Sequence, residues 1–291
     1  MKPRLSISIG AIAMLGLATS IAAAEPTVRL SPKTARPGDA VLVTVTRTKT
    51  TPEGKAAGNP LQFFRSKSGY QAVFAVPLVD APDTVDVEVT GAKQPASIKV
   101  LAITFPDSKL VVDDELANPP PAERDRIDAD NKAIITATRK ADGEPQFTRG
   151  FQRPAGKITS GFGDWRTFND GHKSQHLGLD VAAREGTPAK AINAGTVALV
   201  HDGFLAGKLV VIAHGGGVAS AYYHLSEITV AEGDVVKAGA QVGLVGKTGR
   251  ATGPHLHVTV RVPGGFVDPA RFFKLALTPT PPKKLAATKA P

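Results

Sequence analysis

Cysteine is absent from the 291-residue sequence, and histidine is absent before position 172. The first absence excludes a disulfide-bonded scaffold, a thiolate metal site and a lipid-anchored N-terminal cysteine. The second confines imidazole chemistry to the C-terminal part of the chain. Compact lysine and arginine patches with interleaved aromatic residues are also missing, so the formal charge of +9 does not indicate nucleic-acid binding.

Long apolar runs are missing except near the N-terminus, where residues 7–21 are largely apolar and small. Lys2 and Arg4 precede this run, and Ala22-Ala-Ala24 fits a cleavage site, so residues 1–24 are predicted to be a secretory signal peptide. The alternative, an uncleaved membrane anchor, is disfavoured because the run is short. Removal of Lys2 and Arg4 lowers the formal charge from +9 to +7. An exported basic protein, periplasmic or secreted, suits an anionic polymer such as a cell wall.

Residues 26–105 are predicted to form a separate all-β domain. Val85, Val87 and Val89 alternate with polar residues, and Gly and Pro punctuate the runs, as in a β-sandwich of immunoglobulin-like type. The Cys…Trp…Cys signature of that fold is absent. No catalytic constellation occurs here, which leaves the roles of spacer, substrate-positioning module or inhibitory cover.

The connector at 106–150 is broken by Asn118-Pro-Pro-Pro121 and is predicted to contain a helix of about 18 residues. Pro121 suits its first turn, and Asp142-Gly-Glu-Pro145 ends it. We expect this helix to act as a strut between domains. Residues 278–291 are rich in Pro and Lys and are predicted to be a disordered tail, either inert or in contact with a cell wall.

Residues 151–277 are predicted to form a second, mostly antiparallel β domain, because no helical period appears. Its predicted strands are 195–200, 209–212, 218–223, 241–245 and 256–262. Gly246-Lys-Thr248 is an incomplete phosphate-binding loop, since its first glycine would fall on Gln241. The hairpin at 232–239 is similar to that of biotinyl and lipoyl carriers but lacks their lysine-bearing turn. His172, His201 and His214 are expected to have structural roles.

Two short motifs in the C-terminal domain place histidines and a carboxylate on single strand faces. Side chains alternate between the two faces of a strand, so His176, Gly178 and Asp180 are predicted to share one face. His255 and His257 are predicted to share a face of another strand, opposite Leu256 and other apolar residues. Two histidines and one aspartate are the three protein ligands of a catalytic zinc site that leaves a fourth position for water. Glycine at position 178 would keep that space free.

Together with Tyr222-Tyr-His224-Leu, the motifs His176-Leu-Gly-Leu-Asp180 and His255-Leu-His257 resemble, in order and spacing, the M23 family of zinc metallopeptidases. These are the lysostaphin- or LytM-like cell-wall endopeptidases, and the resemblance covers roughly residues 150–273. Thr159-Ser-Gly-Phe-Gly163 and Val267-Asp-Pro269 resemble the start and end of the family's domain. The resemblance implies a LytM-like β fold and one Zn²⁺ per chain, held by His176, Asp180 and His257. It also implies that His224 and His255 act on water and the transition state.

The predicted function is therefore an exported zinc metalloendopeptidase that hydrolyses peptide cross-links of bacterial peptidoglycan through a metal-activated water. Peptidoglycan peptides are the expected partner, with a possible contact of the N-terminal domain at the groove, and no stable membrane insertion is expected after signal cleavage. One alternative is a LytM-like regulator of cell-wall amidases without enzymatic activity, although such proteins have lost metal ligands. The other is an adhesive or wall-binding protein, which would leave the metal motifs unexplained.

Overall fold

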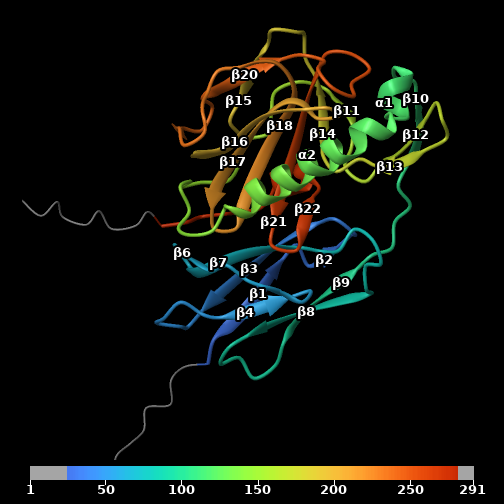
Figure 1. Cartoon of the computed structure of the whole chain (residues 1–291). Helices are drawn as coiled ribbons and strands as arrows, with labels where there is room; N and C mark the ends of the chain where they lie inside the picture. Colours follow the sequence, from blue (N-terminus) through green and yellow to red (C-terminus); the bar gives the residue numbers. More distant parts are fainter. Residues whose placement is uncertain (1–24, 281–291) are drawn as a thin grey trace, which may run out of the picture.

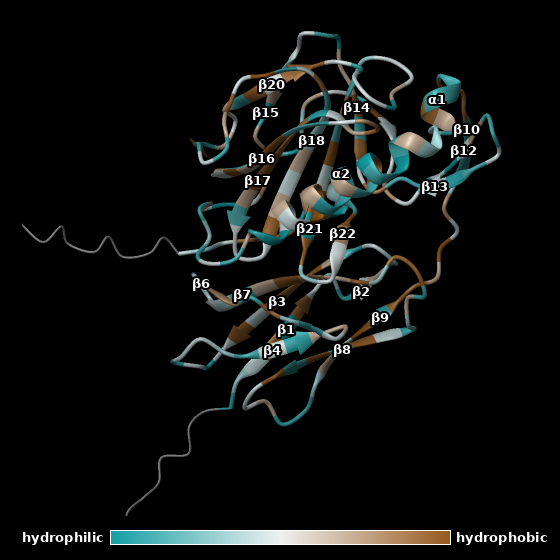
Figure 2. Cartoon of the chain, in the orientation of Figure 1, coloured by the Kyte–Doolittle hydropathy of each residue, from teal (hydrophilic) through white to brown (hydrophobic). Residues whose placement is uncertain are grey.

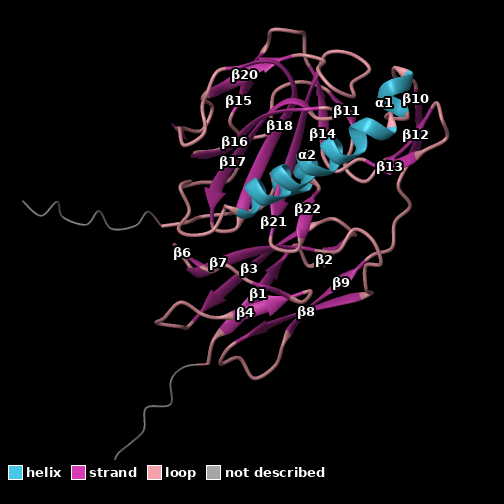
Figure 3. Ribbon diagram, viewed as in Figure 1, coloured by secondary structure: helices cyan, strands magenta, loops and turns pink. Residues whose placement is uncertain are grey.

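The computed structural model describes residues 25–280, so the predicted signal peptide and residues 281–291 of the predicted tail lie outside the described part. Strands make up most of its regular secondary structure (Figure 3), as expected for a mostly β protein. The helices are α1 (Asp114–Ala117), α2 (Pro121–Arg139) and α3 (Pro269–Phe272). In the described residues no helix is long and apolar enough to cross a membrane.

Two sheets are built from the N-terminal part, which lies below the C-terminal sheet in Figure 1. One sheet has the strand order β1 (Thr27–Ser31), β3 (Ala40–Thr46), β7 (Gly69–Ala75) and β6 (Phe64–Ser66). The other has the order β2 (Thr34–Ala35), β9 (Ala96–Val100), β8 (Thr84–Val89), β4 (Gly54–Ala56) and β5 (Asn59–Pro60).

The two N-terminal sheets enclose one hydrophobic core, and the sheet of β3 and β7 also packs against the C-terminal part. Val41 and Val43 on β3 belong to the N-terminal core, whereas Leu42 belongs to the core of the C-terminal part. This explains why the sequence of β3 is apolar on nearly every residue: both of its faces are buried. The ion pair between Asp39 and Arg271 crosses the same boundary.

A ten-stranded sheet carries the C-terminal part, and its central strands are coloured mainly as hydrophobic in Figure 2. Its main path is β11 (Ile158–Ser160), β14 (Leu179–Ala182), β21 (His255–Val262), β18 (Val218–Ile228), β17 (Gly207–Gly215), β16 (Gly195–Gly203) and β19 (Val235–Val236). Off this path lie β15 (Pro188–Lys190), β20 (Gln241–Val245) and β22 (Gly265–Val267). All five predicted strands of this region are present.

A small fourth sheet lies between the two parts of the chain in sequence and pairs the connector with the C-terminal part. It consists of β10 (Asp107–Leu110), β12 (Trp165–Phe168) and β13 (Lys173–Gln175), with β10 parallel to β12. Lys173 lies 2.5 Å from Asp107, and Thr167 donates a hydrogen bond to the same carboxylate. Residues 107–110, which fall within the predicted connector, therefore form a strand beside the C-terminal domain.

Helix α2 begins at Pro121, as predicted, and runs for 19 residues across the C-terminal sheet (Figure 1). Ile134 and Ala137 are buried in a cluster with Leu209 and Val211 of β17. Asp130 accepts hydrogen bonds from His201 and from the backbone N–H of Phe204. The helix is therefore not the free strut that we expected, because its apolar side covers one face of the sheet.

Candidate metal centre

Three side chains converge on one point between β13, β14 and β21. His176 Nε2 lies 3.1 Å from Asp180 Oδ1 and 2.9 Å from His257 Nδ1, and the latter two atoms are 2.7 Å apart. Ligands held tetrahedrally at zinc–ligand distances are separated by roughly 3.3 Å. A small expansion of this triangle therefore gives one face of a zinc coordination sphere, and its residues are the predicted set.

The pairing of β14 with β21 places Asp180 directly opposite His257. His176 comes to them differently from the prediction, because residues 176–178 are not part of a strand. The backbone of His176 exchanges hydrogen bonds with Gly163 and Asp164, so the chain here crosses from the small sheet to the large one. The expected common strand face for residues 176–180 is therefore wrong, although the ligands still meet.

Gly178 explains how the chain passes so close to the centre. A Cβ atom at this position would lie 2.5 Å from His257 Cε1 and 2.7 Å from the backbone oxygen of Val258. Both distances are well below van der Waals contact, and the backbone oxygen has no flexible end that could move away. Glycine is thus required here for space rather than for an unusual backbone angle.

The surroundings of the three groups suit metal binding. His176 Nδ1 lies 2.5 Å from the carbonyl oxygen of Gly161, which only accepts, so Nδ1 carries a proton and Nε2 is the ring atom directed at Asp180 and His257. Burial would raise the pKa of Asp180, but hydrogen bonds with His176 and His257 outweigh it and hold that pKa well below the ordinary range. Burial lowers the pKa of His257 to about 4 against the opposing effect of Asp180.

This donor set fits a zinc ion. His176 Nε2 and Asp180 Oδ1 lie 3.1 Å apart, and a cation bound between them would take the place of the proton of their hydrogen bond. Two imidazoles and one carboxylate are typical zinc ligands, and three protein ligands leave room for a fourth. His176, Asp180 and His257 form a metal-competent group in which all three residues are buried.

Comparison with known proteins agrees with this geometry. The family model described as peptidase family M23 matches residues 174–269. A solved structure from Pseudomonas aeruginosa, described as a peptidase M23, is 31% identical with a TM-score of 0.64, and the match covers 82% of this chain and 94% of that one. This chain belongs to peptidase family M23.

Two curated relatives match a shorter part of this M23 chain. The DD-carboxypeptidase/endopeptidase Mpg of Neisseria meningitidis is 44% identical over 94 residues, which is 32% of this chain and 22% of that protein. The peptidoglycan DD-endopeptidase ShyA of Vibrio cholerae is 36% identical over 162 residues, or 52% of this chain and 37% of the relative. The matches therefore span about a fifth to two fifths of these longer relatives.

Beside the metal centre of this M23 chain lie the two other predicted imidazoles. The ring centroids of His224 and His255 are 5.1 Å apart, and His224 is 5.8 Å from His257. His224 Nδ1 donates to the carbonyl oxygen of Thr248 at 2.8 Å, and His255 Nδ1 donates to that of Gly253 at 2.8 Å. Each ring therefore keeps its Nε2 lone pair available for chemistry.

A β-bulge in β18 turns His224 toward the site. The register of β18 against β17 shifts between Lys208 and Val210, so that two residues of β18 oppose one of β17. His224 has φ +60°, a left-handed conformation that is uncommon for residues other than glycine. Burial, followed by the nearby imidazoles of His257 and His255, lowers the pKa of His224 to about 3. The ring is thus neutral when the chain is folded near pH 7.

Sequence reasoning missed Arg166, which contacts the centre from β12. Arg166 Nη2 lies 2.5 Å from Asp180 Oδ2, the carboxylate oxygen that does not face the histidines, and 3.2 Å from Ser160 Oγ. The ion pair is largely buried, with 18% and 9% of the two side chains exposed. Its signal in the sequence was its position between the glycine motif at 159–163 and His176, and an arginine alone is not specific.

A groove of about 430 Å³ runs beside Asp180 and His255. One wall comes from residues 108–112 of the connector, and another from residues 250–254, which precede His255. None of the groove's lining residues belongs to the N-terminal sheets at 27–100. The groove is open next to two site residues, so an extended chain lying in it would pass the metal centre.

The remaining predicted candidates lie apart from the site. His214 is fully buried between the carbonyl oxygen of Ala194 and the hydroxyl of Ser220, and His201 bonds Asp130 of α2. His172 stacks on Phe168 with ring centroids 6.2 Å apart. The structural roles expected for these three are consistent with those contacts. The incomplete phosphate loop, by contrast, contributes Thr248, whose carbonyl oxygen orients His224.

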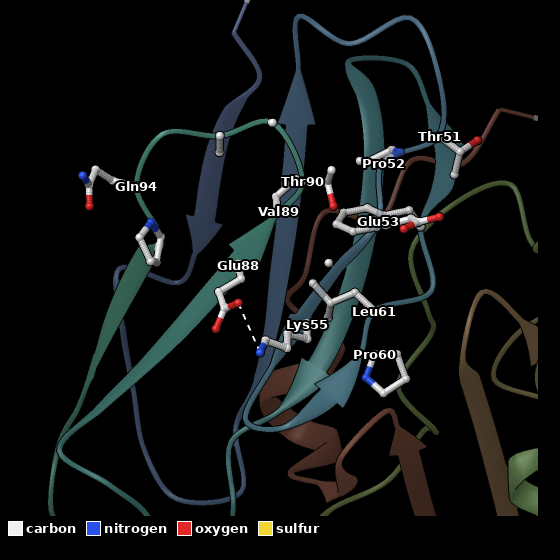
Figure 4. Close-up of a pocket in the computed structure, with 15 residues that line it drawn as sticks. Thr51, Pro52, Glu53, Lys55, Pro60, Leu61, Glu88, Val89, Thr90 and Gln94 are labelled. Atoms are coloured by element: carbon white, nitrogen blue, oxygen red, sulfur yellow. Dashed lines mark ion pairs between the residues drawn. The ribbon is translucent and has the colours of Figure 1, made fainter.

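A larger hollow of about 760 Å³ lies in the N-terminal sheets, and Figure 4 shows its lining residues. Its one marked ion pair joins Lys55 to Glu88 at 3.2 Å, with more than half of each side chain exposed. Exposed pairs of this kind contribute little free energy. Because no histidine lines this hollow, it offers no counterpart to the chemistry of the metal centre.

Proposed function

We propose that this chain is a zinc metalloendopeptidase that hydrolyses peptide cross-links of bacterial peptidoglycan. The observation that carries the proposal is the meeting of His176, Asp180 and His257 with two further imidazoles beside an open groove. Similarity to peptidoglycan DD-endopeptidases of Vibrio cholerae supports this class of substrate. His176, Asp180 and His257 are the proposed metal ligands, and His224 and His255 are the proposed catalytic residues.

The chain's own groups prepare the site for hydrolysis of an amide. When bound, zinc supplies a Lewis acid that activates water and polarises the scissile carbonyl. Arg166 holds the outer oxygen of Asp180, so that the inner oxygen stays directed at the two histidines. The backbone carbonyl of Gly161 fixes the tautomer of His176 in the same way. These contacts set the geometry before substrate binds.

His255 and His224 are placed to move protons and to bind an oxyanion. In each ring Nδ1 is bonded to a backbone oxygen, of Gly253 for His255 and of Thr248 for His224, which leaves Nε2 for chemistry. His255 Nε2 lies 3.6 Å from Asp180 Oδ1, which makes it the nearer base to a water at the centre. We assign proton uptake to His255. His255, once protonated, binds the developing oxyanion and then passes its proton to the leaving amine. His224, whose pKa burial lowers to about 3, stays neutral and is assigned to orienting the water.

Other features of the chain support a location in the cell envelope. The predicted signal peptide supports a periplasmic or secreted location for a basic chain that acts on an anionic polymer. We propose that residues 26–105 act as a support that positions the groove. The buried packing of Leu42 and the hydrogen bond from Ala75 N–H to the carbonyl oxygen of Pro263 favour a fixed attachment. No residue before Ser108 lines the groove, which disfavours inhibition by the N-terminal sheets.

The competing functions are a regulator of amidases without activity and a wall-binding protein. Purified sacculi incubated with the zinc-loaded protein, with and without a chelator, separate the three by mass spectrometry of the released fragments. We expect cross-link cleavage products that disappear with the chelator and return when zinc is added back. A regulator would release nothing by itself, and a binder would sediment with the sacculi without releasing fragments. Either result from metal-loaded protein would overturn the proposal.

A further inference from the structure

Arg250 is a cationic group of the groove that has no anionic partner in residues 25–280. It lines the groove together with Asp180 and His255. Its guanidinium carbon lies 4.3 Å from the centroid of the Phe168 ring. The arginines that form ion pairs within the described part are Arg126, Arg166 and Arg271, and Arg250 is not among them.

The backbone around Arg250 is fixed tightly. Its N–H donates to the carbonyl oxygen of Leu205 at 2.8 Å. Gly249 has φ +68°, and a Cβ atom there would lie 2.4 Å from the backbone nitrogen of Gly207, so only glycine allows this close approach. Thr248 donates its hydroxyl proton to the carbonyl oxygen of Leu225. The same segment that orients His224 therefore holds Arg250 at a set position.

The charges around the groove leave Arg250 uncompensated. Arg166 is matched by Asp180, and Asp164 already accepts hydrogen bonds from Gly161 N–H and Ser160 Oγ. Burial, followed by the like charge of Arg166, lowers the pKa of Arg250, while the charge of Asp170 acts in the opposite direction. A divalent cation at the centre would add further positive charge. A half-buried cation in such surroundings favours an anionic ligand.

We propose that Arg250 binds a carboxylate of the substrate, and that the preferred substrate is a peptide with a free carboxylate next to the scissile amide. A guanidinium binds a carboxylate through two parallel hydrogen bonds, and Phe168 fixes the plane in which those bonds are offered. The proposal rests on the hydrolytic function above and specifies its substrate class. Arg250 then sets substrate preference, whereas the histidines carry out the chemistry.

Matched synthetic peptides test this directly. Two pairs are needed, one for each side of the scissile amide, and the members of a pair differ only in a carboxylate or a carboxamide on the adjacent residue. We expect the wild-type protein to cleave one carboxylate peptide with a kcat/KM roughly tenfold or more above that of its carboxamide partner. Arg250→Gln should bring this ratio close to one, mainly by raising KM for the carboxylate peptide.

Two further variants control for indirect effects. Arg124→Gln removes an exposed arginine of α2 that is not among the residues lining the groove, and it should keep the wild-type ratio. Arg250→Lys keeps the charge but loses the planar contacts, so an intermediate ratio is expected. Calorimetry compares the binding of the carboxylate and carboxamide product fragments to zinc-loaded protein without turnover. Measurements of zinc content and thermal stability check that each variant is folded.

The peptide assays distinguish a wrong assignment of Arg250 from a wrong hydrolytic function. If the wild-type protein cleaves no member of either pair and releases nothing from sacculi, the hydrolytic function itself is wrong. If it cleaves both members of each pair equally, or if Arg250→Gln keeps the preference, the assignment of Arg250 is overturned while the hydrolytic function stands. If Arg250→Gln fails to fold, the proposal is tested by the kcat/KM ratios of the wild type and of Arg250→Lys. Equal wild-type rates on all four peptides would contradict it. So would an unchanged ratio in Arg250→Lys.

Discussion

Arg166 and Asp180 form a buried ion pair in which Nη2 lies 2.5 Å from Oδ2, on the opposite side of the carboxylate from the two histidines. The two oxygens of the Asp180 carboxylate therefore have different partners. One faces the metal position, and the other is held by a cation from the small sheet. The orientation of Asp180 thus depends on β12 as well as on its own strand.

Loss of Arg166 should weaken metal binding. In Arg166→Gln the outer oxygen of Asp180 loses its charged partner, and we expect zinc affinity to fall by about 10–100-fold. Competition with a chromogenic chelator measures this without relying on activity. Arg184→Gln, at an exposed arginine, should keep the wild-type affinity. Equal affinities for wild type and Arg166→Gln would show that the ion pair has no part in holding zinc.

Substitution of the two histidines of the motif at 255–257 should affect zinc content and turnover differently. His257→Ala removes a proposed ligand, so stoichiometric zinc and activity should be lost together. His255→Ala should retain zinc but lose about 10²-fold or more in kcat, because a general base contributes on that scale. Zinc content by atomic spectroscopy and steady-state rates on released peptides distinguish the two. Near-wild-type turnover in His255→Ala would remove that residue from the mechanism.

Gly178→Ala should disrupt the centre without removing any ligand. The added Cβ would lie 2.5 Å from His257 Cε1, so the imidazole is forced away from Asp180. We expect loss of tight zinc binding while the circular dichroism spectrum stays that of a folded β protein. Gly253→Ala is the matched control, since a Cβ atom there meets nothing within 4 Å. Wild-type zinc affinity in Gly178→Ala would show that the site can rearrange freely.

Buried His214 should make stability fall as the solution becomes acidic. Burial lowers its pKa from 6.5 to about 4, against a smaller opposing effect of the hydrogen bond to Ala194. The unfolded chain therefore takes up this proton at a higher pH than the folded chain. The contribution to stability is complete above pH 6.5 and is lost progressively toward pH 4, by about 3 kcal/mol in total.

Urea unfolding of metal-free protein between pH 7 and 4 measures this dependence. His214→Gln has no titrating group at this position, and it should be less stable at pH 7 but lose less stability on acidification. The difference between the two profiles isolates His214 from the other buried imidazoles. Parallel profiles would show that His214 does not titrate as the structure indicates.

The β-rich C-terminal domain could be predicted from the pattern of its residues, whereas the meeting of its motifs was expected only from the resemblance to the M23 family. In β21 the alternation of His255, Leu256, His257 and Val258 is long enough to define two faces, and the burial of that strand follows it. The alternation of polar and apolar residues along a strand indicates which of its faces is buried. The backbone at 176–178 was predicted wrongly, because hydrogen bonds to Gly163 and Asp164 override the local pattern.

Other features depend on contacts that no local pattern encodes. The conformation of His224 arises from a bulge that is visible only in the register of β17 against β18. The burial of Ile134 in α2 depends on the sheet beneath it, since its helix has many charged residues. Arg166 and Arg250 take on their significance from neighbours that are distant in sequence, and an isolated arginine gives no signal of that kind.

The connector strand β10 has a consequence for any shortened form of this protein. The family model matches residues 174–269, yet one side of the groove is built by residues 108–112, and Arg166 also precedes the matched region. A fragment trimmed to the matched region would keep all five proposed histidine and aspartate site residues. It would lose residues 108–112 of the groove wall and the ion pair of Arg166 with Asp180. The shape of the groove thus depends on residues that precede the matched region as well as on that region itself.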